Sequence, residues 1–279
     1  MIHDDTNCLL GEGPMWHPEQ ADLFWFDIYA RRLHRKGQHW DFPLLVSAAG
    51  WVDRDTLLVA SEVGLHRFDI LSGAHEKLAD IEGDNPVTRS NDGRADPQGG
   101  FWIGTMGKGA ETGAGSIWRY YKGEVRRIIP GITITNAICF APDGTTAYFA
   151  DSATQIIHLV RLDSDGWLAG APELFIDLSG TPYTPDGAVV AADGTLWNAQ
   201  WGTSRVAVYD TAGREIAAHA FPALQTSCPA FGGPDLTTLY CTSAAAGLGQ
   251  SALATTPHQG RTFAVPTATR GQAEHRVLL

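Results

Sequence analysis

Apolar and polar positions along the chain follow one recurring pattern. A short apolar run, a polar turn with Asp, Gly or Pro, and a second apolar run centred on a large side chain succeed one another. This alternation predicts a β-hairpin with short strands. Clear copies occupy residues 93–104, 137–150, 188–199 and 229–242, and looser copies occupy residues 13–26 and 48–60. The large residues at the centre of the second run are Phe24, Leu58, Trp102, Tyr148, Trp197 and Tyr240.

These copies fill the chain at a fairly even spacing. Successive central residues are 34 to 49 residues apart, and further strand-like stretches such as 116–121 and 124–129 lie between the copies. About four strands and about 46 residues per repeat are typical of a propeller blade. We therefore predict an all-β fold, a six-bladed β-propeller that occupies residues 1–279 as a single domain. A β-sandwich of similar strand number is the alternative, but it does not require six similar units at regular spacing.

The register of the repeats indicates which side chains meet at the axis. In a blade the first strand of the hairpin is innermost, so the residue that leads into it lies near one mouth of the central channel. Equivalent positions from all blades should converge there. Counting back eleven or twelve residues from each central residue gives Glu12, Val46, Asn91, Asn136, Asp186 and Cys228.

Two carboxylates and two carboxamides directed at one mouth of the channel predict a metal site. Unpaired carboxylates are costly to bury, and a bound cation offsets that cost. Oxygen ligands suit hard divalent ions and exclude a thiolate site, which leaves Ca²⁺, Mg²⁺, Mn²⁺, Zn²⁺ and Fe²⁺ open. Taken singly, an Asn before a strand or a Pro-Asp-Gly triplet is usually a turn former. The shared register is what favours a metal site.

The loops after the second strands should form the walls of the same mouth. Arg89 lies two residues before Asn91 and is a candidate for binding hydroxyl groups or a developing oxyanion. Trp201 follows a central strand beside Gly202, which favours a pocket wall over a core position. The other residues expected in these loops are Asp27, Glu62, 106–108, Asp151, Ser152, Gln200 and Ser243.

Composition and charge exclude several classes of function. The 20 basic and 31 acidic residues give a net charge of −11, which disfavours binding to nucleic acids and to anionic membranes. No run of about eighteen apolar residues indicates a membrane span, and the start of the chain lacks the pattern of a secretory signal. The four scattered cysteines are expected to be reduced thiols, and we expect a cytoplasmic protein.

The chain also carries four longer motifs in a fixed order. They are residues 10–16 (LGEGPMW), residues 89–99 (RSNDGRADPQG) followed by 101–106 (FWIGTM), residues 133–139 (TITNAIC), and residues 184–187 (TPDG). Together these motifs resemble the SMP-30/gluconolactonase/LRE family, also called regucalcin-like lactonases. The pattern is most similar to bacterial sugar lactonases of the xylonolactonase and arabinonolactonase type.

The resemblance implies an activity and a role for individual residues. The implied reaction is the metal-dependent hydrolysis of a sugar lactone to its aldonic acid, with one divalent metal ion as cofactor and a small-molecule sugar lactone as partner. Glu12, Asn136 and Asp186 would be the direct metal ligands, and Asp186 would also be the catalytic acid/base. Arg89 and Asn91 would contact the substrate. We expect a monomer or a weak dimer.

The chain departs from the family pattern at two places. The family often has Gly after the metal-binding Asn, where this chain has Ala137, and a small residue is retained. Some members carry a substrate-contacting Glu in the loop that follows the Gly-Thr-Met segment. Direct counting places Gly109 there, and Glu111 would take that role after a shift.

Two other functions remain open at this point. A non-catalytic, calcium-binding regulatory propeller would bind Ca²⁺ without turning over lactones. A promiscuous lactonase or phosphotriesterase on the same scaffold would accept other esters. Competing nucleophilic chemistry has no support, because the chain lacks both a GxSxG and an HExxH motif.

Overall fold

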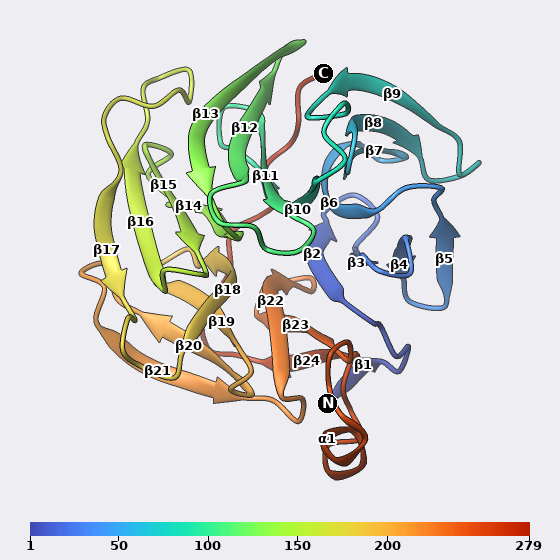
Figure 1. Ribbon diagram of the computed structural model, residues 1–279, viewed down its shortest axis with the longest axis vertical. Helices are drawn as coiled ribbons and strands as arrows, with labels where there is room; N and C mark the ends of the chain where they lie inside the picture. Colours follow the sequence, from blue (N-terminus) through green and yellow to red (C-terminus); the bar gives the residue numbers. More distant parts are fainter.

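Six antiparallel sheets of four strands each surround a central axis in the computed structural model, which describes all 279 residues (Figure 1). Each sheet is one blade, and its first strand is innermost. Blade 1 contains β2 (Gly11–His17), β3 (Asp22–Asp27), β4 (Arg32–Arg35) and β5 (Gln38–Asp41). Blade 2 contains β6 (Val46–Asp53), β7 (Thr56–Ser61), β8 (Gly64–Asp69) and β9 (His75–Asp80). Blade 3 contains β10 (Thr88–Ala95), β11 (Phe101–Gly107), β12 (Gly115–Tyr121) and β13 (Glu124–Ile132).

The second half of the ring repeats this arrangement. Blade 4 contains β14 (Thr135–Phe140), β15 (Thr146–Asp151), β16 (Ile156–Arg161) and β17 (Glu173–Asp177). Blade 5 contains β18 (Thr184–Val190), β19 (Leu196–Trp201), β20 (Arg205–Tyr209) and β21 (Glu215–Ala220). Blade 6 contains β22 (Gln225–Gly232), β23 (Thr238–Ala244), β24 (Thr262–Pro266) and, outermost, β1 (Ile2–Asp4).

This architecture confirms the six-bladed propeller and rules out the sandwich. The six predicted central residues all lie on the second strand of their blade, on β3, β7, β11, β15, β19 and β23. The ring is closed by the N-terminal strand, because Ile2 pairs with Phe263 of β24. This pairing joins the two ends of the chain in one blade.

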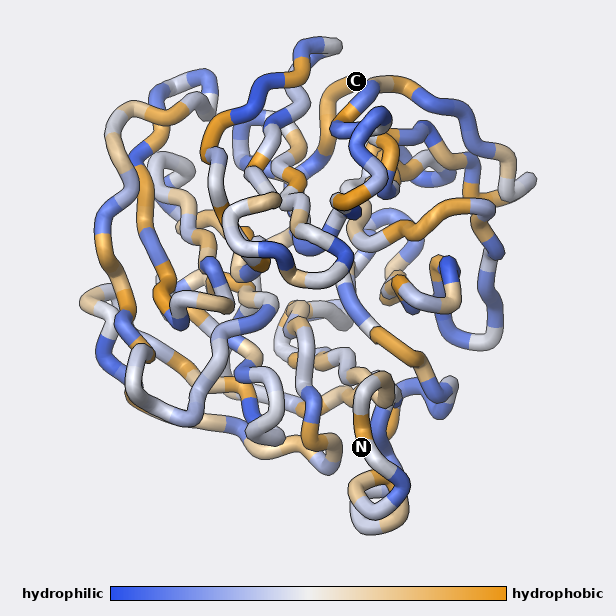
Figure 2. Tube along the Cα trace, in the orientation of Figure 1, coloured by the Kyte–Doolittle hydropathy of each residue, from blue (hydrophilic) through white to orange (hydrophobic).

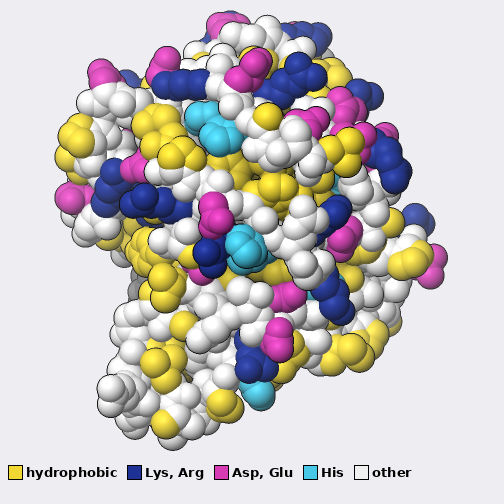
Figure 3. All heavy atoms as spheres, turned by 90° about the vertical axis from the view of Figure 1, so that its right-hand side faces the viewer, with side chains coloured by type: hydrophobic (Ala, Val, Ile, Leu, Met, Phe, Trp, Pro, Cys, Tyr) yellow, Lys and Arg dark blue, Asp and Glu magenta, His cyan; other side chains and the backbone are white.

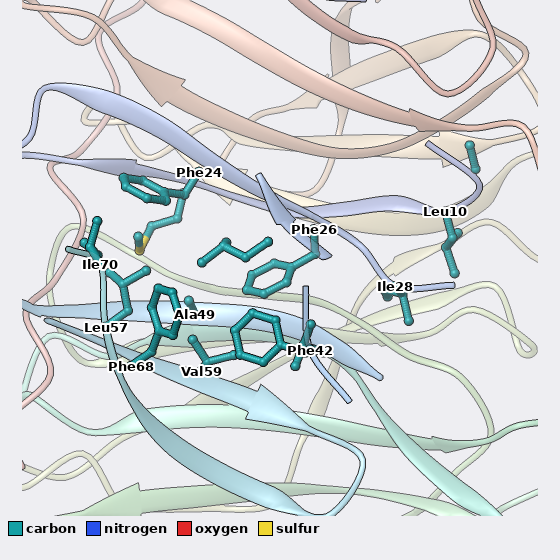
Figure 4. Close-up of a cluster of buried hydrophobic side chains, with 14 residues drawn as sticks. Leu10, Phe24, Phe26, Ile28, Phe42, Ala49, Leu57, Val59, Phe68 and Ile70 are labelled. Carbon is teal, nitrogen blue, oxygen red and sulfur yellow. The ribbon is translucent and has the colours of Figure 1, made fainter. Parts of the chain in front are cut away.

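The hydrophobic core is divided among the interfaces between blades. Six separate apolar clusters are present, and each joins the facing sheets of two neighbouring blades. Figure 4 shows the largest cluster, in which Phe24 and Phe26 of blade 1 pack towards Leu57, Val59 and Phe68 of blade 2. Apolar stretches accordingly recur in every blade along the chain (Figure 2). Packing between blades, rather than one central core, therefore holds the ring together.

The only helix lies in an excursion from blade 6. Helix α1 (Gln250–Thr255) belongs to the loop between β23 and β24, and none of its residues is buried. Residues 245–260 contain no charged side chain, and the lobe at the bottom of Figure 3 is correspondingly free of charged atoms. With six residues, α1 is far too short to cross a bilayer, and the structure contains no other helix.

The C-terminal segment crosses the ends of the inner strands that lie far from the predicted mouth. Gln272 Nε2 donates to the carbonyl oxygens of Phe140 and Val190, at 3.0 and 2.9 Å. Glu274 forms a 2.5 Å ion pair with Arg94, a buried residue of the innermost strand β10. The tail thus covers one end of the central channel, and the other end holds the candidate site.

Candidate functional site

The inner strand of every blade is irregular at one equivalent place. In all six blades the pairing between the first and second strands shifts register near the start of the inner strand. In each blade, the residue three positions after the central residue of the second strand pairs with one residue of the inner strand. The residue that directly follows this partner on the inner strand is the axial residue. In blades 1 to 6 the axial residues are Glu12, Ser47, Asn91, Asn136, Asp186 and Ser227.

This register confirms four of the predicted axial positions and shows that two were wrong. Val46 and Cys228 are each one residue away from the equivalent place, which belongs to Ser47 and Ser227. The count failed because the axial residue of blade 2 lies eleven residues before Leu58, where twelve were counted, and that of blade 6 lies thirteen residues before Tyr240. All six axial positions are therefore polar. The two serines bond to protein: Ser47 Oγ donates to Ser90 Oγ at 2.8 Å, and Ser227 Oγ donates to the Gly11 carbonyl.

In blades 1 and 4 the residue after the axial residue has a left-handed backbone conformation. Gly13, directly after Glu12, has φ +52°, and a Cβ there would overlap the Ser47 carbonyl oxygen. Ala137, directly after Asn136, adopts the same left-handed conformation with φ +55° while fully buried. A non-glycine residue in this region costs roughly 1–2 kcal/mol. The alanine noted as a departure from the family pattern therefore holds a strained backbone beside Asn136.

Carboxylates at the ends of the second strands clamp the segments that lead into the inner strands. Asp27 accepts from the amides of Leu9 and Leu10, at 2.8 and 3.1 Å, two residues before Glu12. Asp151 accepts in the same way from the amides of Thr133 and Ile134, at 2.9 and 3.0 Å. Both aspartates were expected to face the mouth. Instead they fix the backbone that presents Glu12 and Asn136.

A cavity of about 200 Å³ opens where four of the axial residues meet. At about 30 Å³ per water in the liquid, it holds roughly seven waters, the size of a small monosaccharide derivative. Its lining residues are Leu10, Glu12, Tyr29, Arg89, Asn91, Met106, Ile134, Asn136, Ser152, Thr184, Pro185, Asp186 and Trp201. The cavity is thus apolar on its walls and polar at its base, as small-molecule sites usually are.

A chain of hydrogen bonds fixes the amides at the base. Arg89 Nη1 donates to Asn91 Oδ1 at 2.7 Å, and Asn91 Nδ2 donates to Asn136 Oδ1 at 3.0 Å. Asn136 Nδ2 then donates to Ser152 Oγ at 2.8 Å, and this hydroxyl donates to the Pro185 carbonyl at 2.6 Å. Asn91 Nδ2 also donates to the Thr135 carbonyl at 2.8 Å, so both of its N–H groups are engaged. Asn136 Oδ1 keeps one free lone pair.

The carboxylates of the site lie in a strongly desolvated environment. Burial and the nearby charge of Asp92 raise the pKa of Glu12 to about 8. Burial and the charge of Glu12 raise the pKa of Asp186 well above its usual range. Glu12 and Asp186 are each 6% exposed, and Arg89 is the only basic residue in the cavity lining. Ionisation of both carboxylates therefore requires additional positive charge.

The donor set suits a divalent cation. The only protein donor to the Asp186 carboxylate is the neighbouring Gly187 amide, Glu12 accepts only from the Gly13 amide, and Asn136 Oδ1 has a spare lone pair. These three oxygens, from blades 1, 4 and 5, are hard ligands. No cluster of three His, Cys, Asp or Glu side chains could hold a metal, so the third ligand of such a site is an amide. The residues thus fit the implied metal ion.

The structure brings most of the predicted site residues together. Glu12, Arg89, Asn91, Asn136, Asp186 and Trp201 all line the cavity. Glu111 does not line it: its carboxylate accepts from the Gly109 amide at 3.1 Å within its own exposed loop.

Three residues of the site were not singled out from the sequence. Tyr29 lines the cavity from the loop after β3. Asp92, a third buried carboxylate, accepts from the amide of Ile138 at 2.7 Å. Asn198 donates to the carbonyl oxygens of Asp186 and Gly187, at 2.9 and 3.1 Å, and so holds the Asp186 bulge. Asn198 could have been found from the sequence, because a polar residue next to an aromatic one on a buried strand, as in Trp197-Asn198, indicates a side chain with a hydrogen-bonding role.

All four cysteines are buried and free, as expected of reduced structural thiols. Burial raises the pKa of each of them, which keeps the thiols protonated. None of the four lines the cavity. They therefore contribute packing and no nucleophile.

Comparison with known proteins agrees with this geometry. Residues 10–245 match the family described as SMP-30/Gluconolactonase/LRE-like region. The chain is 38% identical to L-arabinolactonase of Azospirillum brasilense, over 98% of this chain and 93% of that protein. It is 34% identical to pentonolactonase XacC of Haloferax volcanii, over 98% and 96% of the two chains.

A solved structure gives the same result for the fold. The calcium-binding protein regucalcin from Agrobacterium tumefaciens is 41% identical, with a TM-score of 0.98 over 100% of this chain and 97% of that one. The family match covers all of the axial residues. This chain therefore belongs to the SMP-30/gluconolactonase/LRE family.

Proposed function

We propose that this protein hydrolyses a sugar lactone to its aldonic acid with one divalent cation held by Glu12, Asn136 and Asp186. The observation that carries the proposal is the set of three convergent oxygen ligands beside Arg89 and Asn91, at the base of a monosaccharide-sized cavity. Relatives named as arabinolactonase and pentonolactonase support the substrate class.

The side chains divide the work of the reaction. When bound, a divalent cation supplies Lewis acidity to the lactone carbonyl. Asp186 accepts a proton from the attacking water. It then donates a proton to the ring oxygen as the bond between this oxygen and the carbonyl carbon breaks. One water is consumed, and the product is a hydroxy acid. The neighbouring Gly187 amide is the only protein donor to the Asp186 carboxylate, so an oxygen of this carboxylate remains available for the transfer.

Arg89 and Asn91 bind and orient the substrate. The Arg89 guanidinium is 5% exposed and fixed by its 2.7 Å bond to Asn91 Oδ1. A positioned donor of this kind contributes roughly 3–4 kcal/mol when it stabilises a developing oxyanion. The apolar walls, including Trp201 and Met106, exclude water from the rest of the ring.

The test is a pH-stat assay with neutral pentono- and hexonolactones, before and after chelation and with a panel of divalent ions restored. We expect turnover that a chelator abolishes and one or more ions restore. The Asp186→Asn variant should lose at least about 100-fold in kcat. Asp193→Asn, which changes an exposed aspartate in the hairpin turn of the same blade, is the matched control and should retain activity. Turnover that survives complete chelation would refute the role of the metal.

A calcium-binding protein without catalysis is the second candidate. It is favoured by the similarity to regucalcin from Agrobacterium tumefaciens, a protein described as calcium-binding. Calorimetry with Ca²⁺ alongside the lactone assay separates the two. Tight Ca²⁺ binding without turnover of any lactone would favour this candidate.

A further inference from the structure

The least explained residue of the cavity is Tyr29. Its ring lines the cavity yet remains 47% exposed, one of the largest exposed apolar side chains of the molecule. The ring lies 5.9 Å from the Arg89 guanidinium. No part of the proposed proton transfer uses it. An exposed aromatic surface that faces a polar, desolvated site is a surface for a ligand to cover.

The backbone of Tyr29 is held rigidly. It lies within a turn in which the Arg31 amide donates to the Ile28 carbonyl at 3.1 Å, and Arg31 has φ +57°. Asp27, which clamps the segment before Glu12, also accepts from the Ala30 amide at 3.1 Å. The same carboxylate thus fixes Tyr29 and the strand of Glu12. Little conformational entropy is lost when a ligand packs on such a ring.

The charges around the ring indicate the kind of ligand. Arg89 is the only basic side chain in the cavity lining, and its Nη1 group donates to Asn91 Oδ1 and to the Ser90 carbonyl. Lys108, which directly follows β11, forms an ion pair with Glu62 at 2.6 Å. The lining itself supplies two carboxylates. A substituent with its own negative charge would therefore compete with Glu12 and Asp186 for Arg89 and for the proposed divalent cation.

We infer that Tyr29 is a specificity-determining residue whose ring packs on the C–H face of a neutral sugar lactone. This inference rests on the proposed function and deepens it. Sugar rings present C–H faces as well as hydroxyl groups, so the ring of Tyr29 and the donors of Arg89 together match both parts of such a ligand. Lactones that carry a carboxylate, sulfonate or phosphate are poor substrates.

Steady-state kinetics of three variants test the inference. Tyr29→Ala should raise KM for neutral lactones about five- to tenfold and leave kcat within about twofold, because ring packing stabilises ground state and transition state alike. Tyr29→Phe should keep KM within about twofold. Tyr183→Ala is the matched control: Tyr183 also stacks on an arginine, Arg205, at 3.9 Å, but it does not line the cavity. Its KM should not change.

Direct binding separates this inference from the proposed function. A neutral aldonolactam, in which nitrogen replaces the ring oxygen, is titrated calorimetrically into wild type and Tyr29→Ala, with cation affinity measured in parallel. Five- to tenfold weaker lactam binding at unchanged cation affinity supports the inference, even where no lactone is turned over and the proposed function fails. Unchanged KM and unchanged lactam affinity in Tyr29→Ala would overturn it, as would equal turnover of neutral and carboxylated lactones.

Discussion

Ser152 connects two of the candidate metal ligands, and its removal should weaken cation binding without unfolding the blade. Its hydroxyl accepts from Asn136 Nδ2 at 2.8 Å and donates to the Pro185 carbonyl at 2.6 Å. Pro185 directly precedes Asp186. The Ser152→Ala variant removes both bonds and leaves a buried amide N–H and a buried carbonyl without partners.

The size of the effect follows from these two lost bonds. A buried polar group left unsatisfied costs about 1–3 kcal/mol. Part of that cost is relieved when the Asn136 amide rotates, and rotation turns Oδ1 away from the cation. Loss of groups that orient metal ligands typically lowers affinity 10–100-fold. We therefore expect the dissociation constant of Ser152→Ala for its divalent cation to rise by 10–100-fold, and apo stability to fall by about 1–3 kcal/mol.

Competition against a chromophoric chelator measures the affinity, and urea unfolding of the apo protein measures the stability. Ser243→Ala is the matched control, because Ser243 is a buried serine of the second strand of blade 6 that donates to the Arg261 carbonyl at 2.7 Å and does not line the cavity. It should lose stability and keep its cation affinity. A dissociation constant of Ser152→Ala within twofold of wild type would refute the reasoning.

Two further predictions concern stability. Gly187→Ala should lower Tm by about 3–10 °C, because its Cβ would overlap Cys228 of the next blade, whereas Gly170→Ala, whose Cβ meets open space, should leave Tm unchanged in the same calorimetric scan. Burial lowers the pKa of His66 to about 4, so the unfolded chain binds a proton below pH 6.5 and the folded chain does not. Stability should therefore fall by about 1–2 kcal/mol, after screening by nearby solvent, as pH drops from 6.5 to 4. Urea unfolding at pH 7 and pH 5 measures this loss, and an equal loss in His66→Gln would contradict the assignment.

The blade pattern was accessible from the sequence because each hairpin carries its own local signal. A large residue on the second strand, flanked by apolar neighbours, must be buried between blades wherever it occurs. Phe24 and Trp102 are accordingly fully buried. The closure of the ring was not accessible, since the three residues of β1 carry no pattern that distinguishes an outer strand of blade 6 from a loose end.

The axial positions were predictable only in part, because their distance from the central residue varies from 11 to 13 residues between blades. Glu12, Asn91, Asn136 and Asp186 were found by counting, while blades 2 and 6 required Ser47 and Ser227 in place of Val46 and Cys228. Side chains from loops were harder still. Tyr29 faces the cavity while Asp27, two residues earlier, turns back to the Leu9 and Leu10 amides. Such a choice depends on which backbone amides lack partners in the folded molecule.

Blade 6 combines the N-terminal strand β1 with the late strands β22 to β24, and this has a consequence for folding during synthesis on the ribosome. β1 is translated before blades 1 to 5, its partner β24 is translated after them, and the segment that pairs Glu274 with Arg94 follows β24. Blades 1 to 5 can stack as they emerge, whereas the interface between blades 6 and 1 has the smallest apolar cluster of the six. The nascent chain therefore carries an open arc with two unprotected blade faces until β24 has emerged and pairs with β1. Emergence of β24, rather than synthesis of blades 1 to 5, allows the ring to close.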